Sequence, residues 1–341
     1  MSRLSNVLNV GIGAAPPSSA LGALAASMSS GQWADFTMLN LNAALVFSGE
    51  SQGIRSIIAY GPKAVWDPVH KKIQFWGIGH GDQDTPLIFP YLITYDDATN
   101  QWSKALAQIG KGHAYSHLTV DPNTGDLYHR EYNSNQVSKK PYGQAWTTIA
   151  SKLTGNNQVG GSLEWFPELN SGAGGLIFTD QGGMQKWNPA LGTWSYIGAG
   201  FNPILGNYGQ LGASAGGFVY GGGGTGGANG TVSLVYRVGS AGTSYAGIAN
   251  APHGIAISVE SSALVAHPNG SGDLLLFESP SPGSANRIHR FNGTSWSQIG
   301  THSIGKDNYF CTPIPEYDVI VFICQNNNAS TADPNCRVYK P

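Results

Sequence analysis

The stretch SGQWADF, from Ser30 to Phe36, contains a phrase that recurs along the whole chain. The phrase is a Trp followed by polar and apolar residues in alternation, as in the later segments NQWSKAL, GTWSYIG and TSWSQIG. Its aromatic residue recurs at Trp102, Trp146, Trp194, Tyr245 and Trp296. These five positions are 44, 48, 51 and 51 residues apart. A steady period of this length indicates a repeat architecture.

A second phrase supports the same period. It consists of an apolar residue, often an acid, then a Pro, a short polar turn and alternating apolar residues. The prolines of this phrase are Pro68, Pro122, Pro167, Pro268 and Pro315. Asp67, Asp121 and Glu168 adjoin these prolines and are expected to form turns. Each unit therefore predicts four short strands, separated by turns rich in Pro, Asn and Gly.

The predicted fold is an all-β, six-bladed β-propeller of four-stranded antiparallel blades, in one domain over residues 31–341. The last unit ends at Pro341 after its third strand, so the N-terminal strand around Trp33 is expected to complete this blade and close the ring. Such pairing protects strand edges that would otherwise be exposed. The glycine run from Gly221 to Gly230 is interpreted as a flexible surface hairpin, because no phosphate-loop Lys follows it.

The composition of the chain argues against two classes of binding partner. The chain of 341 residues has 47 Gly, 19 Pro, only 11% charged residues and a net charge of -2. This charge provides no electrostatic footprint for nucleic acid or an anionic membrane, and neither partner is expected. The first thirty residues are small and apolar but interrupted by Asn, Gly and Pro, which is atypical of a signal peptide. We expect residues 1–30 to form an arm that docks on another chain, with disorder as the alternative.

The three cysteines, Cys311, Cys324 and Cys336, lack the spacing of a zinc site. A disulfide between two of them and three reduced thiols both fit the sequence. No metal and no cofactor are expected.

The order of elements in each unit resembles the kelch or galactose-oxidase-like β-propeller superfamily. The resemblance rests on an apolar strand, a Gly-rich strand end, a third strand with Tyr-x-x-Asp or Asn, and the W-x-x-apolar fourth strand, from about Trp33 onward. The double glycines typical of kelch units are clear at Gly174-Gly175 and Gly182-Gly183. The superfamily includes oxidases, lyases, sugar binders and scaffolds, so the resemblance implies a fold and not one function. The chain lacks a Tyr, Cys and His set that would match the copper site of the oxidases.

Candidate site residues are concentrated in the first two units. They are His80, Asp82, His113, Tyr115, His117, Tyr128, His129, Arg130 and Tyr132. The resemblance implies a uronate-polymer lyase as one option, which needs a base, an acid and a cation beside the uronate carboxylate. For a lyase, the catalytic residues would be His113 or His117 as base or neutraliser, Tyr128 or Tyr132 as acid, and Arg130 as carboxylate clamp.

Two other interpretations apply to the same residues. His80, Asp82, Tyr115 and His129 are the expected residues for binding a ligand without catalysis. Packing between blades is the alternative to any site, because strand alternation places Tyr128 on one face and His129 on the other. A glycosidase built on Asp82 and Asp84 is less well supported, because both lie in a turn.

The sequence favours a non-catalytic, surface-exposed structural or adhesion propeller of a bacteriophage particle, either a capsid decoration or a tail-associated protein. Its low charge and its loops rich in Asn, Gly and Ser suit a virion surface, and its expected ligand is a host polysaccharide. The N-terminal arm is expected to bind a capsid or tail protein. The alternative is a secreted polysaccharide lyase that acts outside the cell.

Overall fold

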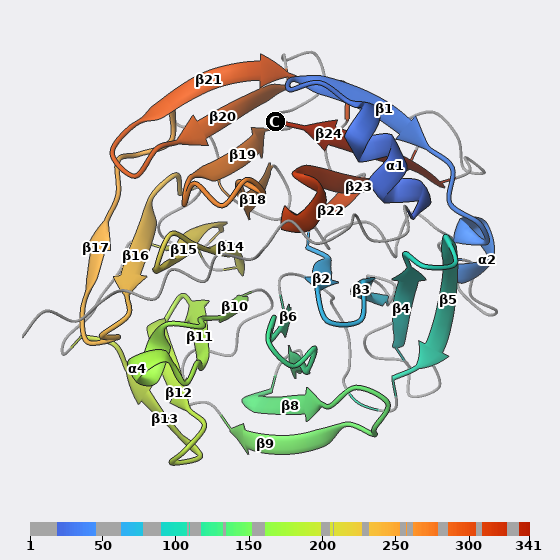
Figure 1. Ribbon diagram of the computed structural model, residues 1–341. Helices are drawn as coiled ribbons and strands as arrows, with labels where there is room; N and C mark the ends of the chain where they lie inside the picture. Colours follow the sequence, from blue (N-terminus) through green and yellow to red (C-terminus); the bar gives the residue numbers. More distant parts are fainter. Residues whose placement is uncertain are drawn as a thin grey trace, which may run out of the picture.

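Six small antiparallel sheets, each of four strands, surround a central axis in the computed structural model (Figure 1). The predicted six-bladed propeller is thereby confirmed. The structure describes residues 19–45, 63–77, 90–107, 109, 117–131, 134–151, 161–198, 205–206, 208–226, 232–252, 257, 262–278, 286–304, 309–325 and 334–341.

The first three blades follow one another along the chain, each built from innermost to outermost strand. Blade 1 contains β2 (Val65–Asp67), β3 (Lys72–Gly77), β4 (Tyr91–Asp96) and β5 (Gln101–Leu106). Blade 2 contains β6 (Leu118–Val120), β7 (Leu127–Arg130), β8 (Gln136–Lys140) and β9 (Thr147–Ser151). Blade 3 contains β10 (Ser162–Trp165), β11 (Leu176–Asp180), β12 (Gly183–Asn188) and β13 (Thr193–Tyr196), with the short helix α4 (Leu169–Gly172) between its first two strands.

The other three blades complete the ring. Blade 4 contains β14 (Tyr208–Ala215), β15 (Phe218–Thr225), β16 (Val235–Gly239) and β17 (Tyr245–Gly247). Blade 5 contains β18 (Ser262–Ala266), β19 (Leu274–Glu278), β20 (Arg287–Phe291) and β21 (Trp296–Thr301). Blade 6 contains β22 (Tyr309–Ile314), β23 (Val319–Gln325), β24 (Pro334–Lys340) and β1 (Gln32–Phe36), with the 3-10 turn η3 (Pro315–Tyr317) after β22.

The two repeated phrases correspond to two kinds of contact. On the outermost strands, the aromatic residue is directed into the blade: Trp102 and Trp194 are buried between exposed neighbours. On the turns after the innermost strands, the acid before the proline caps the backbone. Asp67 Oδ1 accepts hydrogen bonds from the N–H groups of Val69 (2.9 Å) and His70 (3.1 Å). The expected turn role of Asp67 is borne out, and Asp121 caps Asn123 in the same way. Glu168 differs, because its side chain makes no cap hydrogen bond to α4.

The N-terminal strand closes the ring as expected. β1 pairs antiparallel with β24, from Gln32 opposite Lys340 to Phe36 opposite Cys336. Trp33 stacks on Tyr339 with ring centroids 4.7 Å apart. In Figure 1, β1 (blue) lies along the outer side of β24 (red).

The segment before β1 contains a helix that packs on the ring. In helix α1 (Ala20–Ser27), Leu21 is fully buried and Ala25 nearly so. Ser19 Oγ lies 3.2 Å from the hydroxyl of Tyr317 in η3, and Lys340 Nζ donates a hydrogen bond to the carbonyl of Ala25 (2.8 Å). Residues 19–28 therefore contribute to the hydrophobic core beside blade 6. The expected arm covered residues 1–30, but residues 19–28 pack on the ring. Any part of the arm that lies free of the ring therefore ends before Ser19.

The interpretation of the glycine run as a surface hairpin requires a correction in its described part, whereas residues 227–230 lie outside the described residues. Gly221 to Gly224 lie inside β15 and are buried, not in a surface hairpin. A Cβ atom on Gly221 would lie 2.3 Å from Oγ1 of Thr179 in blade 3, and one on Gly223 would lie 1.9 Å from the carbonyl oxygen of Ile257. Glycine is needed here because other parts of the chain approach the backbone closely.

Candidate functional site

The strand directions separate the ring into two faces. The hairpins that join first and second strands lie on one face, which we call the proline face after Pro68, Pro122, Pro167, Pro268 and Pro315. The first strands begin and the second strands end at the opposite face. His117 directly precedes β6 and Arg130 ends β7, so the described part of the predicted catalytic cluster belongs to the opposite face. His80, Asp82, His113, Tyr115 and Tyr132 lie outside the described residues.

His117 and Arg130 join blades 2 and 3. Both side chains are fully buried. His117 Nε2 accepts a hydrogen bond from the N–H of Gly161 (3.1 Å) and lies 3.4 Å from Arg130 Nη1. The Arg130 guanidinium also lies over the ring of Phe178, 5.2 Å from its centroid. These side chains are therefore occupied by packing between blades.

His129 is enclosed by aromatic rings on the side of blade 1. Its ring stacks on Trp76 with centroids 3.9 Å apart and meets Trp146 edge to face at 6.2 Å. Burial, followed by the charge of Arg130, lowers the pKa of His129 to about 3. The imidazole is therefore neutral at physiological pH and inaccessible to a polymer.

Tyr128 is directed toward blade 3 and away from His129. Its ring stacks on Trp165 with centroids 5.1 Å apart. Burial, and then the nearby carboxylates of Asp126 and Asp121, raise the pKa of its phenol. The predicted alternation of these side chains is confirmed, and both faces of β7 are covered by neighbouring blades. For Tyr128, His129 and Arg130 the structure shows packing between blades, the alternative to a ligand site that the sequence left open.

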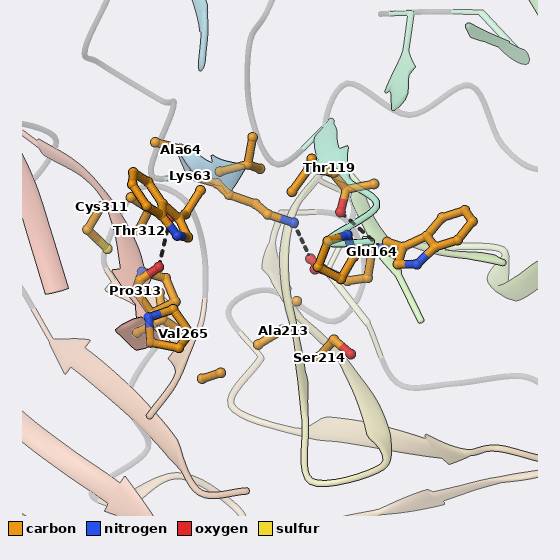
Figure 2. A pocket seen from close by; sticks show the side chains of 18 of the residues that line it. Lys63, Ala64, Thr119, Glu164, Ala213, Ser214, Val265, Cys311, Thr312 and Pro313 are labelled. Atoms are coloured by element: carbon orange, nitrogen blue, oxygen red, sulfur yellow. Dashed lines mark hydrogen bonds and ion pairs between the residues drawn. The ribbon is translucent and has the colours of Figure 1, made fainter. Parts of the chain in front are cut away.

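The proline face holds a cavity at the centre of the ring (Figure 2). Its volume is about 310 Å³, and residues from all six innermost strands line it. We call it the channel cup. Its wall is mostly apolar, with Trp66, Trp165, Pro122 and Val265 among the lining residues.

One ion pair crosses the side of the channel cup. Lys63 precedes β2 in blade 1, whereas Glu164 lies in β10 of blade 3, so the pair bypasses blade 2 (Figure 2). Lys63 Nζ lies 2.5 Å from Glu164 Oε1 and donates a second hydrogen bond to the carbonyl of Leu163 (2.9 Å). Ser162 Oγ lies 2.9 Å from the same Glu164 oxygen. The exposed fractions are 16% for the Lys63 side chain and 7% for that of Glu164.

Glycine at position 212 makes room for this pair. A Cβ atom on Gly212 would lie 2.1 Å from Ser162 Oγ and 2.9 Å from Glu164 Oε1. Sequence reasoning missed Lys63 and Glu164. The available signal was Glu164 itself, a charged residue inside the short apolar strand that precedes a repeated proline.

The described residues offer no metal centre: no group of three or more His, Cys, Asp or Glu among them could hold an ion. Cys311, Cys324 and Cys336 are free thiols and buried, which excludes a disulfide among them in this structure. Among the residues that the structure describes, no helix has the length and apolar character needed to cross a membrane.

Comparison with known proteins supports the fold alone. A fungal alcohol oxidase of the AA5 family, in complex with copper, has a TM-score of 0.53 at 12% identity, over 92% of this chain and 77% of that chain. A GH74 enzyme from Niastella koreensis also has a TM-score of 0.53, at 15% identity, over 82% of this chain. The match covers 48% of the GH74 enzyme, about half of its length. No protein-family profile and no curated protein matches the chain.

Proposed function

We propose that this protein is a non-catalytic, glycan-binding propeller displayed on a surface, as a structural or adhesion component of a bacteriophage particle. The observation that carries the proposal is the burial of His117, His129 and Arg130 between blades. A lyase needs its base and its carboxylate clamp in contact with a polymer, and these three side chains are occupied by packing.

The construction of the ring supports the same function. Closure by β1 places the N-terminal segment beside blade 6, and helix α1 holds it there. The preceding residues are the segment proposed to bind a capsid or tail protein. The low charge of the chain also suits a display scaffold. We include the narrower kelch-like assignment in this proposal, supported by Gly174-Gly175 before β11 and Gly182-Gly183 at the start of β12.

A binding assay that also detects lyase products tests the proposal. The protein is incubated with bacterial surface polysaccharides and uronate polymers, while bound protein and ultraviolet absorbance from unsaturated chain ends are both recorded. We expect binding to at least one polysaccharide without a rise in absorbance. A rise that disappears in His113→Ala and Tyr132→Phe variants would establish the secreted lyase instead.

Particle assembly tests the attachment. We expect a chain lacking residues 1–18 to fold and bind glycan like the full chain but to be lost from purified particles. Retention of the truncated chain on particles would contradict the role of this segment.

A further inference from the structure

We propose that the channel cup binds one neutral sugar unit, at the end of a glycan that enters from the proline face. This inference rests on the proposed glycan-binding function and assigns its site. The cup opens at the proline face, and Lys63, which precedes β2 as His117 precedes β6, lies toward its inner end.

The size and rigidity of the channel cup favour a single small unit. Ligand pockets in proteins span roughly 300 to 1,000 Å³, and this one, at about 310 Å³, is near the lower limit. Its lining comes from the six innermost strands, each held in a closed ring of sheets. A wall of this kind changes little on binding, which reduces the entropic cost of ordering the site.

The ion pair provides hydrogen-bonding groups that suit hydroxyls. An ammonium group has three donors, and Lys63 uses two on Leu163 and Glu164. A carboxylate accepts at two oxygens, and the contacts of Lys63 and Ser162 both fall on Oε1 of Glu164. One wall therefore combines a cationic donor with an anionic acceptor. Adjacent hydroxyls of a sugar, each able to donate and accept, match this combination.

The charge balance of the wall favours a neutral sugar. Lys63 and Glu164 carry opposite charges in direct contact, and Glu316, the other charged lining residue, is paired with Lys71, so the wall has no dedicated charge to offset a uronate or an amine. Bringing a second charge into a mostly apolar cup would require desolvation without a dedicated counter-ion. Glu164 would in addition repel a uronate carboxylate.

The remaining wall suits the apolar side of a sugar ring. Trp66 and Trp165 are only 6% exposed and belong to hydrophobic core clusters behind the wall. Trp165 is fixed by stacking on Tyr128, and its backbone N–H donates to Thr119 Oγ1 (3.0 Å). The prolines that line the cup, Pro68, Pro122, Pro167 and Pro315, present aliphatic surface against which a sugar ring can place its C–H groups while its hydroxyls reach Lys63 and Glu164.

The test uses the full chain with free methyl glycosides of neutral hexoses and the matching uronic acids, measured by titration calorimetry. We expect neutral glycosides to bind and the uronic acids to bind at least tenfold more weakly. The double variant Lys63→Met/Glu164→Gln removes both charges together and should weaken binding of the neutral glycoside at least tenfold.

A second variant tests the same site independently, in case the double variant does not fold. Ser214→Phe introduces a ring at a half-buried position of the cup and leaves the ion pair intact. Ser297→Phe, at an exposed position of the outermost strand β21, is the matched control and should bind like the wild type. Circular dichroism confirms that each variant is folded.

The outcomes separate the two proposals. Wild-type affinity in both cup variants, with polysaccharide binding retained, would overturn the cup as the site and leave the adhesion function standing. Absence of binding to every polysaccharide and glycoside would overturn both. Tighter binding of uronic acids would contradict the neutral sugar.

Discussion

At the scale of single residues, two glycines of blade 2 allow the effect of backbone strain on stability to be distinguished from the effect of a contact between blades. Gly125 and Gly143 have nearly the same φ, 75° and 72°. A Cβ atom on Gly125 would lie 2.4 Å from Nδ1 of His70 and 2.8 Å from Oδ2 of Asp67, both in blade 1, whereas nothing lies within 4 Å of a Cβ on Gly143.

The pair makes a matched prediction. We expect Gly143→Ala to lower the free energy of unfolding by about 1 kcal/mol, because only the left-handed backbone is strained. Gly125→Ala should lower it by roughly a further 1 to 3 kcal/mol, because the new methyl group displaces His70. Urea unfolding of both variants measures the difference, and equal losses would show that the contact between blades contributes nothing.

His129 predicts a dependence of stability on pH. Its folded pKa of about 3 lies below the ordinary value of 6.5. Between these values the unfolded chain takes up a proton that the folded chain does not, so the free energy of unfolding falls as the pH falls through this window. The contribution is up to about 1.4 kcal/mol per pH unit.

The variant His129→Phe keeps a ring between Trp76 and Trp146 and removes the titrating group. We expect its urea midpoint to fall less steeply than that of the wild type across the window. His302, whose pKa burial lowers to about 4, contributes a slope of its own, so the difference between the two proteins is the informative quantity. Parallel slopes would contradict the burial of His129.

Alternation along β7 allowed the opposite directions of Tyr128 and His129 to be predicted. It did not reveal that both directions end in a neighbouring blade. A strand between two blades has no solvent face, so polar residues on it can serve packing on either side. Packing between blades, one of the two interpretations open from the sequence, is therefore what the structure shows for the described residues of β7.

At the scale of elements, helix α1 differs most from its sequence interpretation. The sequence predicts an arm over residues 1–30, because this segment is small and apolar but interrupted by Asn, Gly and Pro. Its docking depends on contacts with η3 and Lys340, which are distant in the sequence. No local pattern indicates such a partner.

Helix α1 makes a stability prediction. Leu21→Ala should lower the free energy of unfolding by about 2 to 5 kcal/mol, because the side chain is fully buried in the core cluster shared with blades 1 and 6. Leu24→Ala on the same helix, at a half-buried position, is the control and should cost clearly less. Chemical denaturation compares them. A small effect at both positions would mean that α1 is not part of the folded core.

Blade 4 shows where composition misled the interpretation. A run of glycines is typical of flexible loops, yet β15 uses glycine because Thr179 and Ile257 lie against its backbone. The alternating pattern of the equivalent strands in other blades was the better guide, because it reflects position in the sheet.

At the scale of the whole molecule, ring closure predicts that the protein can be reconstituted from two pieces. A fragment of residues 37–341 lacks β1 and α1 and should unfold at a lower temperature than the full chain. A peptide of residues 19–36 should restore the melting temperature as its concentration rises, because it binds only the folded ring.

The peptide with Trp33→Ala is the control. It lacks the indole that stacks on Tyr339 and packs at a tilt against Phe322, so at least tenfold more of this peptide should be required for the same effect. If neither peptide changes the melting temperature, β1 is not what closes the ring.

The number of blades and the closing strand were predictable because each depends on a repeated local pattern. The Lys63 and Glu164 pair was not, because it joins blades 1 and 3 across the channel. A period along the chain describes neighbouring blades, whereas contacts across the axis depend on the completed ring.

The three cysteines have a consequence for how opening of the molecule can be observed. Cys311, Cys324 and Cys336 lie on β22, β23 and β24, so all three belong to the blade made from both ends of the chain. Burial raises the pKa of each thiol, to about 12 for Cys324, which makes them poor nucleophiles while the ring is closed. The rate at which an alkylating reagent labels these thiols therefore measures how often blade 6, which contains the first and last strands, opens.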